Sequence, residues 1–178
     1  MKNNTSVKSI LVLVSICLFI SVAMAAINMV TAPKIASAQE RAQQDALSEV
    51  LPENGGFDKL ELQDLPECVT EVYRDLDGQG IVMLLSVKGY DSSNPMSVAV
   101  GYTNDGIIEN CHIISANGET SGIGSKVTQP AFYGQFSGKD SGLENVDAIS
   151  GATVSSGALI EAVKQSFSVF ELIEEVEG

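Results

Sequence analysis

The sequence has 178 residues, of which 44% are hydrophobic and 19% are charged, and its net charge at neutral pH is -13. This length suits one domain with a single core, and the hydrophobic content excludes an intrinsically disordered chain. Residues 1–39 hold three lysines and no acidic residue, whereas residues 40–178 hold seven basic and 23 acidic residues. A domain this acidic, without a basic cluster, is not expected to bind nucleic acid.

The first long feature is an uncharged apolar segment, residues 10–32, which at about 1.5 Å per helical residue is long enough to cross a membrane. An A-x-A triplet at residues 23–25 leaves open a cleaved signal peptide, but the apolar run continues for seven more residues, which favours an uncleaved anchor. Because Lys2 and Lys8 precede the segment, the positive-inside rule places residues 1–9 in the cytoplasm and the acidic domain outside it.

Residues 33–52 are rich in helix-forming residues, and apolar side chains recur among them every three or four positions. The pattern predicts a stalk helix that begins or continues at Pro33 and is ended by Pro52 and the two glycines shortly after it. Residues 53–178 then form the extracytoplasmic domain.

Short segments rich in Val, Ile, Leu and Tyr follow, with turn signals between them, and they predict strands at residues 68–76, 81–90, 96–103 and 107–115. The Asn-Asp-Gly turn at residues 104–106 is a strong hairpin signal before the last of them. We therefore expect an antiparallel sheet.

A glycine-containing loop at residues 117–124 and an aromatic segment at residues 132–136 come after the sheet. Apolar residues at helical spacing then predict an amphipathic helix from Ser155 or Ser156 to about Val176, with one of the two serines as N-cap. The predicted fold class is α+β: a transmembrane helix, a stalk helix and an antiparallel sheet that is closed by a C-terminal amphipathic helix.

The three cysteines lie far apart and form no C-x-x-C pair, which argues against a zinc or iron–sulfur site built by this chain alone. Cys68 and Cys111 are expected to be buried free thiols or one disulfide. His112, the only histidine, is expected as a strand residue rather than a metal ligand. No metal site is predicted.

With one histidine, no paired carboxylates and no nucleophile motif, the chain has few groups for acid–base catalysis, which points to a bound cofactor. The segment DAISGATVSS, residues 147–156, leads into the last predicted helix. Its small residues allow close backbone approach, and the N–H groups and hydroxyls at a helix start favour a phosphate. From the residues alone, the segment is either an anion site or a serine-rich helix cap.

This segment resembles the flavinylation motif D-x-x-[ST]-G-A-T of FMN-binding domains, which is matched by Asp147, Ser150, Gly151, Ala152 and Thr153. In that family the final threonine holds FMN through a phosphoester bond that a separate flavin transferase makes outside the cytoplasm. The resemblance implies covalent FMN on Thr153. It also implies transferase recognition of Asp147, Gly151, Ala152 and Thr153, and cofactor contacts from Ser150, Gly151, Ala152 and Ser156.

The loop ETSGIG, residues 119–124, resembles the E-T-P-G-L-G loop of the same family, with serine at position 121 and isoleucine at position 123. Without the proline the loop is less preorganised. The resemblance implies that the flavin ring lies over the loop, with Ile123 against the ring and backbone N–H groups at its polar edge. The implied contact residues are Glu119, Thr120, Gly122, Ile123 and Gly124.

The order of these features along the whole chain resembles the G subunit of the Rnf electron-transport complex. The C subunit of the sodium-translocating NADH:quinone reductase shares the FMN domain but is usually longer. The resemblance implies a membrane complex that moves electrons between reduced ferredoxin and NAD while transporting sodium ions or protons. This chain is then one electron relay and not an enzyme on its own.

Two alternatives stay open: a free-standing, membrane-anchored extracytoplasmic flavoprotein, and a flavin-free structural or binding subunit. Because residues 10–32 contain no ionisable side chain, ion translocation is assigned to partner subunits. Because bases are scarce in the domain, the FMN phosphate is expected to be held by backbone N–H groups, hydroxyls and the bond to Thr153.

Overall fold

A computed structural model describes residues 3–52, 55–170 and 172–173. The chain divides into two compact units, Met1–Arg41 and Ala42–Gly178. Helix α1, Asn3–Val50, runs from the first unit into the second and includes Pro33. Of the two possibilities at Pro33, the structure shows the continuing helix, so the predicted membrane and stalk segments are parts of one helix.

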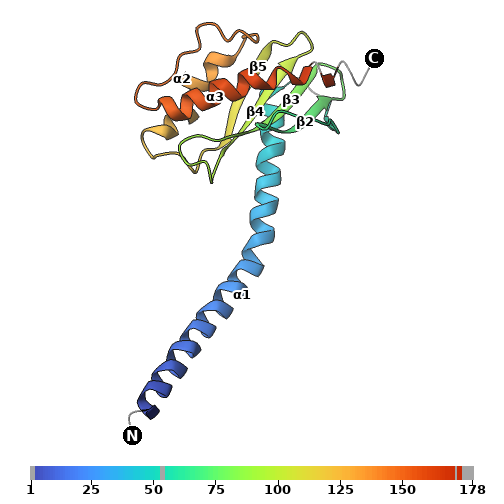
Figure 1. The fold of residues 1–178 in the computed structure, drawn as a ribbon. Coiled ribbons are helices and arrows are strands. Elements are labelled where there is room, and N and C mark those ends of the chain that lie inside the picture. Colours follow the sequence, from blue (N-terminus) through green and yellow to red (C-terminus); the bar gives the residue numbers. More distant parts are fainter. Residues whose placement is uncertain (1–2, 53–54, 171, 174–178) are drawn as a thin grey trace. The chain divides into compact units, whose positions relative to one another are not determined.

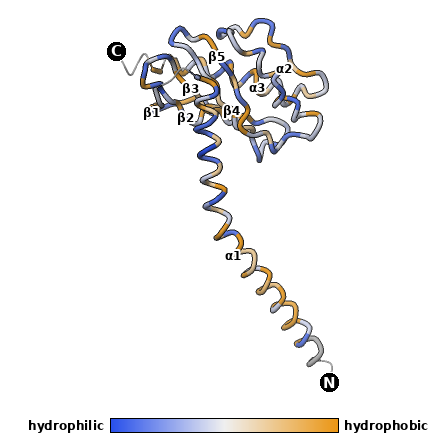
Figure 2. The backbone as a smooth tube through the Cα atoms, turned by 180° about the vertical axis from the view of Figure 1, so that it is seen from behind, coloured by the Kyte–Doolittle hydropathy of each residue, from blue (hydrophilic) through white to orange (hydrophobic). Residues whose placement is uncertain are grey.

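The apolar residues of α1 are concentrated in its first part, and hydrophilic residues prevail in its second part (Figure 2). Among the described residues, one helix is long and apolar enough to cross a membrane, and its most apolar stretch is not buried by other parts of the protein. The Ser15 and Thr31 hydroxyls donate to the carbonyls of Leu11 and Ile27, at 2.8 and 2.9 Å. These polar side chains are thus satisfied within the helix.

The second unit is built on a five-stranded antiparallel sheet in which neighbours in sequence are neighbours in space (Figure 1). Its strands are β1 Phe57–Leu60, β2 Val69–Asp75, β3 Gly80–Val87, β4 Met96–Thr103 and β5 Ile108–Ser115. The predicted sheet is confirmed. The sequence analysis missed β1 because its four residues, FDKL, show neither a hydrophobic run nor an alternating pattern.

The predicted hairpin at residues 104–106 is confirmed. Gly106 has φ 74°, which favours glycine, and its N–H donates to the Thr103 carbonyl at 3.0 Å. The Asn104 side chain donates to the carbonyl of Gly78, 2.7 Å away in the turn between β2 and β3. Two turns at the same end of the sheet are therefore fastened to each other.

Both faces of the sheet are covered. Along β3, Ile81, Met83 and Leu85 belong to one hydrophobic cluster, and the alternate residues Val82 and Leu84 belong to another. The first cluster lies beneath α3, which crosses the face in Figure 1, and beneath the short helices between β5 and α3. These helices are η1 Gly124–Thr128, α2 Pro130–Tyr133, η2 Gly134–Phe136 and α3 Thr153–Ser166.

The end of α1 covers the second face. Ala46, Leu47, Val50 and Leu51 are buried there against β3 and β4. The approach is close enough to require glycine at position 101, because a Cβ atom there would lie 2.4 Å from the Val50 carbonyl oxygen. This close contact fixes where the last turn of α1 lies on the sheet.

The closing helix was predicted with a serine N-cap, and that prediction is wrong. Helix α3 begins at Thr153 with Ala152 as N-cap, and Ser155 and Ser156 lie buried inside its first turn. The Ser156 hydroxyl donates back to the Ala152 carbonyl at 2.8 Å, so it acts within the helix rather than at its start. A turn at residues 167–168 interrupts the predicted helix, and its predicted end at Val176 lies outside the described residues.

The thiols of Cys68 and Cys111 are free, which settles the choice left open by the sequence. Burial raises the pKa of Cys111 to about 12 and also raises that of Cys68. His112 lies on β5, as predicted, with Nδ1 2.9 Å from Oε1 of Glu49 near the end of α1. Within the described ranges, no cluster of three or more His, Cys, Asp or Glu residues can hold a metal ion.

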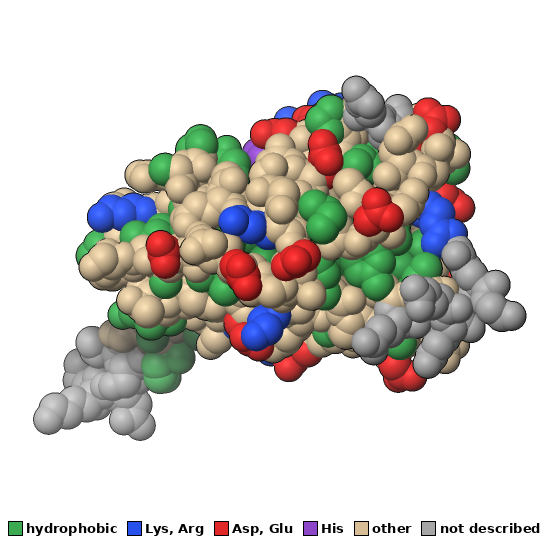
Figure 3. Space-filling view, turned by 90° about the horizontal axis from the view of Figure 1, so that it is seen from above, with side chains coloured by type: hydrophobic (Ala, Val, Ile, Leu, Met, Phe, Trp, Pro, Cys, Tyr) green, Lys and Arg blue, Asp and Glu red, His purple; other side chains and the backbone are tan. Residues whose placement is uncertain are grey.

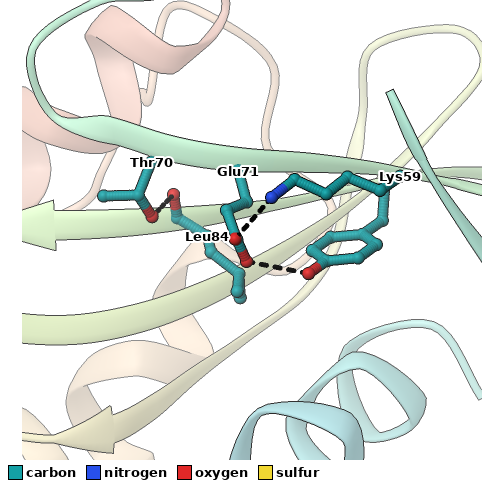
Figure 4. A network of polar contacts seen from close by, with 5 residues as sticks. Lys59, Thr70, Glu71 and Leu84 are labelled. Carbon is teal, nitrogen blue, oxygen red and sulfur yellow. Dashed lines mark hydrogen bonds and ion pairs between the residues drawn. The ribbon is translucent and has the colours of Figure 1, made fainter. Parts of the chain in front are cut away.

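Polar contacts fasten the edge strand β1 to the sheet (Figure 4). The Lys59 ammonium lies 2.7 Å from the Glu71 carboxylate, and the Tyr73 hydroxyl donates to the other oxygen of this carboxylate at 2.8 Å. The hydrogen bond from Lys59 lowers the pKa of Glu71, while burial and the Glu71 contact raise the pKa of Tyr73 to about 12. Thr70 donates to the Leu84 carbonyl at 3.0 Å and so joins β2 to β3.

Candidate functional site

The two segments that the sequence analysis singled out meet around a cavity of about 410 Å³. This volume lies within the range of about 300 to 1,000 Å³ that is common for small-molecule and cofactor sites. The lining residues come from the start of α3, from the loop after β5 and from the loop between β3 and β4. They are Tyr90, Thr120, Ile123, Gly124, Gly151, Ala152, Thr153, Val154 and Ser155.

One side of the cavity is the start of α3. Thr153 is the first residue of the helix and is exposed, and no side chain in the described part of the protein caps the helix start. The first N–H groups of an α-helix have no partner within the helix, and the helix dipole makes this end attractive to an anion. Gly151 has φ 82°, so glycine lets the chain turn directly before the helix. Thr153 is thus accessible, at a place suited to a phosphate.

Ser156 stabilises the turn before α3 through two hydrogen bonds to its backbone. Its hydroxyl oxygen accepts the Ile149 N–H at 3.0 Å while its proton goes to Ala152. Ser156 is buried, and it is not among the residues that line the cavity. Its observed contacts therefore shape the segment that presents Thr153.

The opposite side of the cavity is the loop 119–124. The Thr120 carbonyl accepts the N–H groups of Ile123 and Ser125, both at 3.1 Å, which folds the loop into a tight turn. Gly122 has φ 75°, and its N–H donates to the Ser125 hydroxyl at 2.9 Å. A flavin contact from the Gly122 N–H would have to replace that bond. Ile123 lines the cavity with half of its surface exposed, which makes an apolar wall.

Glu119 lies behind the lining and is only 8% exposed. One of its carboxylate oxygens accepts the Tyr90 N–H at 3.1 Å, and the other accepts the Ser155 hydroxyl. Glycines lie close beside it: a Cβ atom at Gly89 would lie 1.9 Å from the first oxygen, so the carboxylate would have to move. A Cβ atom at Gly124 would lie 2.6 Å from the second. The carboxylate thus joins three segments of the cavity wall.

The structure brings most of the predicted site residues together. Those that line the cavity are Thr120, Ile123, Gly124, Gly151, Ala152 and Thr153; those outside the lining are Glu119, Gly122, Ser150 and Ser156. Asp147 is exposed, and its backbone N–H donates to the Gln135 side chain at 3.0 Å.

Sequence reasoning did not include Tyr90 and Val154 among the contact residues, and it counted Ser155 only among the hydroxyls that could donate to an anion, although all three line the cavity. Tyr90 was assigned to the end of a strand, but β3 ends at Val87, so Tyr90 lies in the loop that follows. The adjacent glycine at position 89 was the available signal, because glycine often marks a close approach of segments.

The cavity lining offers a phosphate uncharged hydrogen-bond donors instead of basic side chains. None of the described lining residues is lysine or arginine. The Ser155 hydroxyl already donates to Glu119, which leaves Thr120 and Thr153 to supply hydroxyl donors. On the face shown in Figure 3, acidic and basic side chains are interspersed and do not gather into one basic patch. Backbone N–H groups at the start of α3 and these hydroxyls are therefore the available phosphate donors.

Two family models match the chain in its two parts. The FMN-binding domain matches residues 89–168, a range that contains every residue lining the cavity. The RnfG N-terminal region matches residues 1–50, which include all of α1.

Three relatives are similar to this chain over most of its length. The G subunit of the proton-translocating ferredoxin:NAD(+) oxidoreductase complex of Clostridium ljungdahlii is 28% identical, with 93% of this chain and 92% of that protein covered. The Na(+)-translocating counterpart of Acetobacterium woodii is 29% identical, with 84% of each chain covered. The G subunit of the ion-translocating oxidoreductase complex of Methanosarcina acetivorans is 29% identical, with 70% of this chain and 73% of that protein covered. The chain therefore resembles Rnf complex G subunits over most of its length, and it joins a segment that matches the RnfG N-terminal region to one that matches the FMN-binding domain.

Proposed function

We propose that this chain is the electron-relay subunit of a membrane-bound ferredoxin:NAD oxidoreductase complex and holds FMN covalently through a phosphoester to Thr153. The observation that supports this best is the cavity in which an exposed threonine hydroxyl stands at an uncapped helix start, opposite the apolar wall of Ile123. The phosphate of FMN needs the threonine hydroxyl at the helix start, and the flavin ring system needs the apolar wall.

The residues of the chain hold and orient the cofactor in this proposal. The first N–H groups of α3 stabilise the phosphate, while Tyr90, Ile123 and Val154 exclude water from the ring. When bound, FMN supplies one- and two-electron transfer, and the protein supplies position and electrostatics. A covalent bond to Thr153 keeps the cofactor in a domain with few bases to hold its phosphate.

The exposure of Thr153 and Asp147 supports maturation by a separate flavin transferase. Such an enzyme must reach the threonine hydroxyl and the residues before it, which are Asp147, Gly151 and Ala152. The Thr153 hydroxyl oxygen then displaces the leaving group from the phosphorus of an activated flavin nucleotide held by the transferase. The transferase also takes up the hydroxyl proton, so no general base from this chain is needed.

The proposed topology has a single span. Residues 10–32 cross the membrane, residues 1–9 lie in the cytoplasm, residues 33–52 form the stalk, and residues 53–178 form the FMN domain outside the cytoplasm. The charge-free apolar segment after Lys2 and Lys8 supports this arrangement. The partners are other integral and peripheral subunits, which provide the path for sodium ions or protons.

The covalent attachment is tested by the intact mass of the chain after co-expression with a flavin transferase. We expect one FMN adduct on the native sequence and none on Thr153→Ala. Thr128→Ala is the matched control, because Thr128 is an exposed threonine of η1 outside the cavity lining. An adduct on Thr153→Ala equal to that of the native chain would refute the assignment.

Membership of a complex is tested by purification from native membranes in a mild detergent. We expect integral membrane subunits to co-purify in constant proportion. Recovery of the flavin-bearing chain without any membrane partner would instead support a free-standing flavoprotein.

A further inference from the structure

The carboxylate of Glu119 is nearly enclosed, yet its hydrogen-bond partners lie in two different segments of the cavity wall. The Tyr90 N–H belongs to the loop after β3, and the Ser155 hydroxyl belongs to the first turn of α3. Glu119 itself begins the loop 119–124. Since Tyr90 and Ser155 both line the cavity, one buried side chain sets the distance between its walls.

We propose that Glu119 is a positioning residue for the cofactor, which acts through Tyr90 and Ser155 and places a fixed negative charge behind the cavity wall. This inference rests on the proposed function and deepens it. It differs from the contact that the sequence predicted for Glu119, because both carboxylate oxygens already accept hydrogen bonds from the protein.

Three observations support the proposal. First, the side chain is 8% exposed, and a buried carboxylate needs hydrogen-bond donors to offset its desolvation. Second, both oxygens act as acceptors, as those of an ionised carboxylate do. Third, glycines at positions 89 and 124 provide the space for it, because a Cβ atom at either position would collide with it. The enclosure is therefore formed by several segments and not by one loop.

Two consequences follow from the position of this charge. Removing both acceptor oxygens separates the loop after β3 from the start of α3, because no bond then replaces either contact. Removing only the charge leaves the walls in place, because a glutamine oxygen still accepts the Tyr90 N–H and the Ser155 hydroxyl can turn to accept from the glutamine amide. The charge itself disfavours adding electrons to a nearby flavin.

The first test uses the chain without cofactor and follows amide hydrogen exchange. In Glu119→Ala, the Tyr90 amide should exchange at least about tenfold faster, the factor that corresponds to one lost hydrogen bond. The Val100 amide in the centre of the sheet should keep its rate. Glu119→Gln should restore the native rate at Tyr90. An unchanged Tyr90 rate in Glu119→Ala would overturn the positioning role.

The second test measures the midpoint potential of the flavin-loaded chain. We expect a more positive potential in Glu119→Gln than in the native chain, because the variant lacks the negative charge. Glu109→Gln, which removes an exposed carboxylate on β5, should leave the potential unchanged, because solvent screens that charge. Equal potentials in the two variants would overturn the proposal.

The two tests separate this inference from the proposed function. If the native chain acquires no flavin, the proposed function fails, while the exchange test still decides whether Glu119 joins the two segments. If Glu119→Ala does not fold, the potential of Glu119→Gln decides, because that substitution keeps the size of the side chain.

Discussion

The two faces of the sheet differ in what they support. The face beneath α3 carries the larger hydrophobic cluster, and α3 begins with the residues that line the cavity. The face beneath the end of α1 carries a smaller cluster, to which α1 contributes Ala46, Leu47 and Val50. No described member of either cluster lines the cavity itself, so the difference lies in the helix that each cluster holds. The comparison indicates that one core holds the site in place and the other fastens the long N-terminal helix to the domain.

The sharpest way to test this comparison is a matched pair of substitutions, Leu159→Ala and Leu84→Ala. Leu159 lies in α3 and Leu84 faces α1, and both side chains are essentially fully buried. Each variant should lose about 3 kcal/mol of unfolding free energy, the usual loss for a buried leucine. Chemical denaturation of the purified protein measures these values.

Only one member of the pair should affect the cofactor. Flavin loading should fall in Leu159→Ala, because a cavity beneath α3 loosens the helix whose start presents Thr153. It should remain native in Leu84→Ala at temperatures where both variants are folded. Equal losses of flavin in the two variants would contradict the conclusion that only the core beneath α3 supports the cavity.

A smaller effect is expected from Gly101→Ala on the α1 face. The added Cβ atom would lie 2.4 Å from the Val50 carbonyl oxygen, so the end of α1 must shift, at a cost of about 2 kcal/mol. Gly134→Ala is the control, because a Cβ atom there meets nothing within 4 Å and the backbone φ is -65°. Thermal unfolding should separate the two variants clearly, and similar melting temperatures would show that α1 does not pack closely on β4.

The smallest expected effect concerns Asp75, which ends β2 and is 2% exposed. Burial by itself would raise its pKa, but backbone N–H groups, including those of Gln79 and Gly55, outweigh burial and hold the pKa below 3.8. Asp75→Asn should cost about 1.5 kcal/mol at pH 6, because it removes an acceptor that is charged in the native chain.

The pH dependence of this effect has a definite sign. A carboxyl group whose pKa is lowered by folding stabilises the protein above its ordinary pKa of 3.8, and this contribution is lost as the pH falls through the folded value. The stability difference between the native chain and Asp75→Asn should therefore shrink between pH 6 and pH 3 in urea titrations. A difference that stays constant over this range would show that the Asp75 charge does not contribute.

Much of the fold could be read from local patterns. The apolar segment at residues 10–32, the β-rich runs and the hairpin glycine at position 106 each depend on interactions between near neighbours in sequence, and the structure agrees with all three. Strand β1 was missed because it is held by its pairing with β2 and by the contact of Lys59 with Glu71, which no local pattern encodes.

In the candidate site, too, some features could be predicted from contiguous sequence motifs and others depend on tertiary contacts. The sequence by itself singled out two segments whose residues line the cavity, because the D-x-x-[ST]-G-A-T match and the ETSGIG loop are each contiguous. It could not place Tyr90 or Ser155 in the cavity wall, nor show that Glu119 hydrogen-bonds to both. Those contacts join residues 29 and 36 positions apart. Only tertiary packing sets such distances, because burial of the carboxylate depends on all three segments meeting at once.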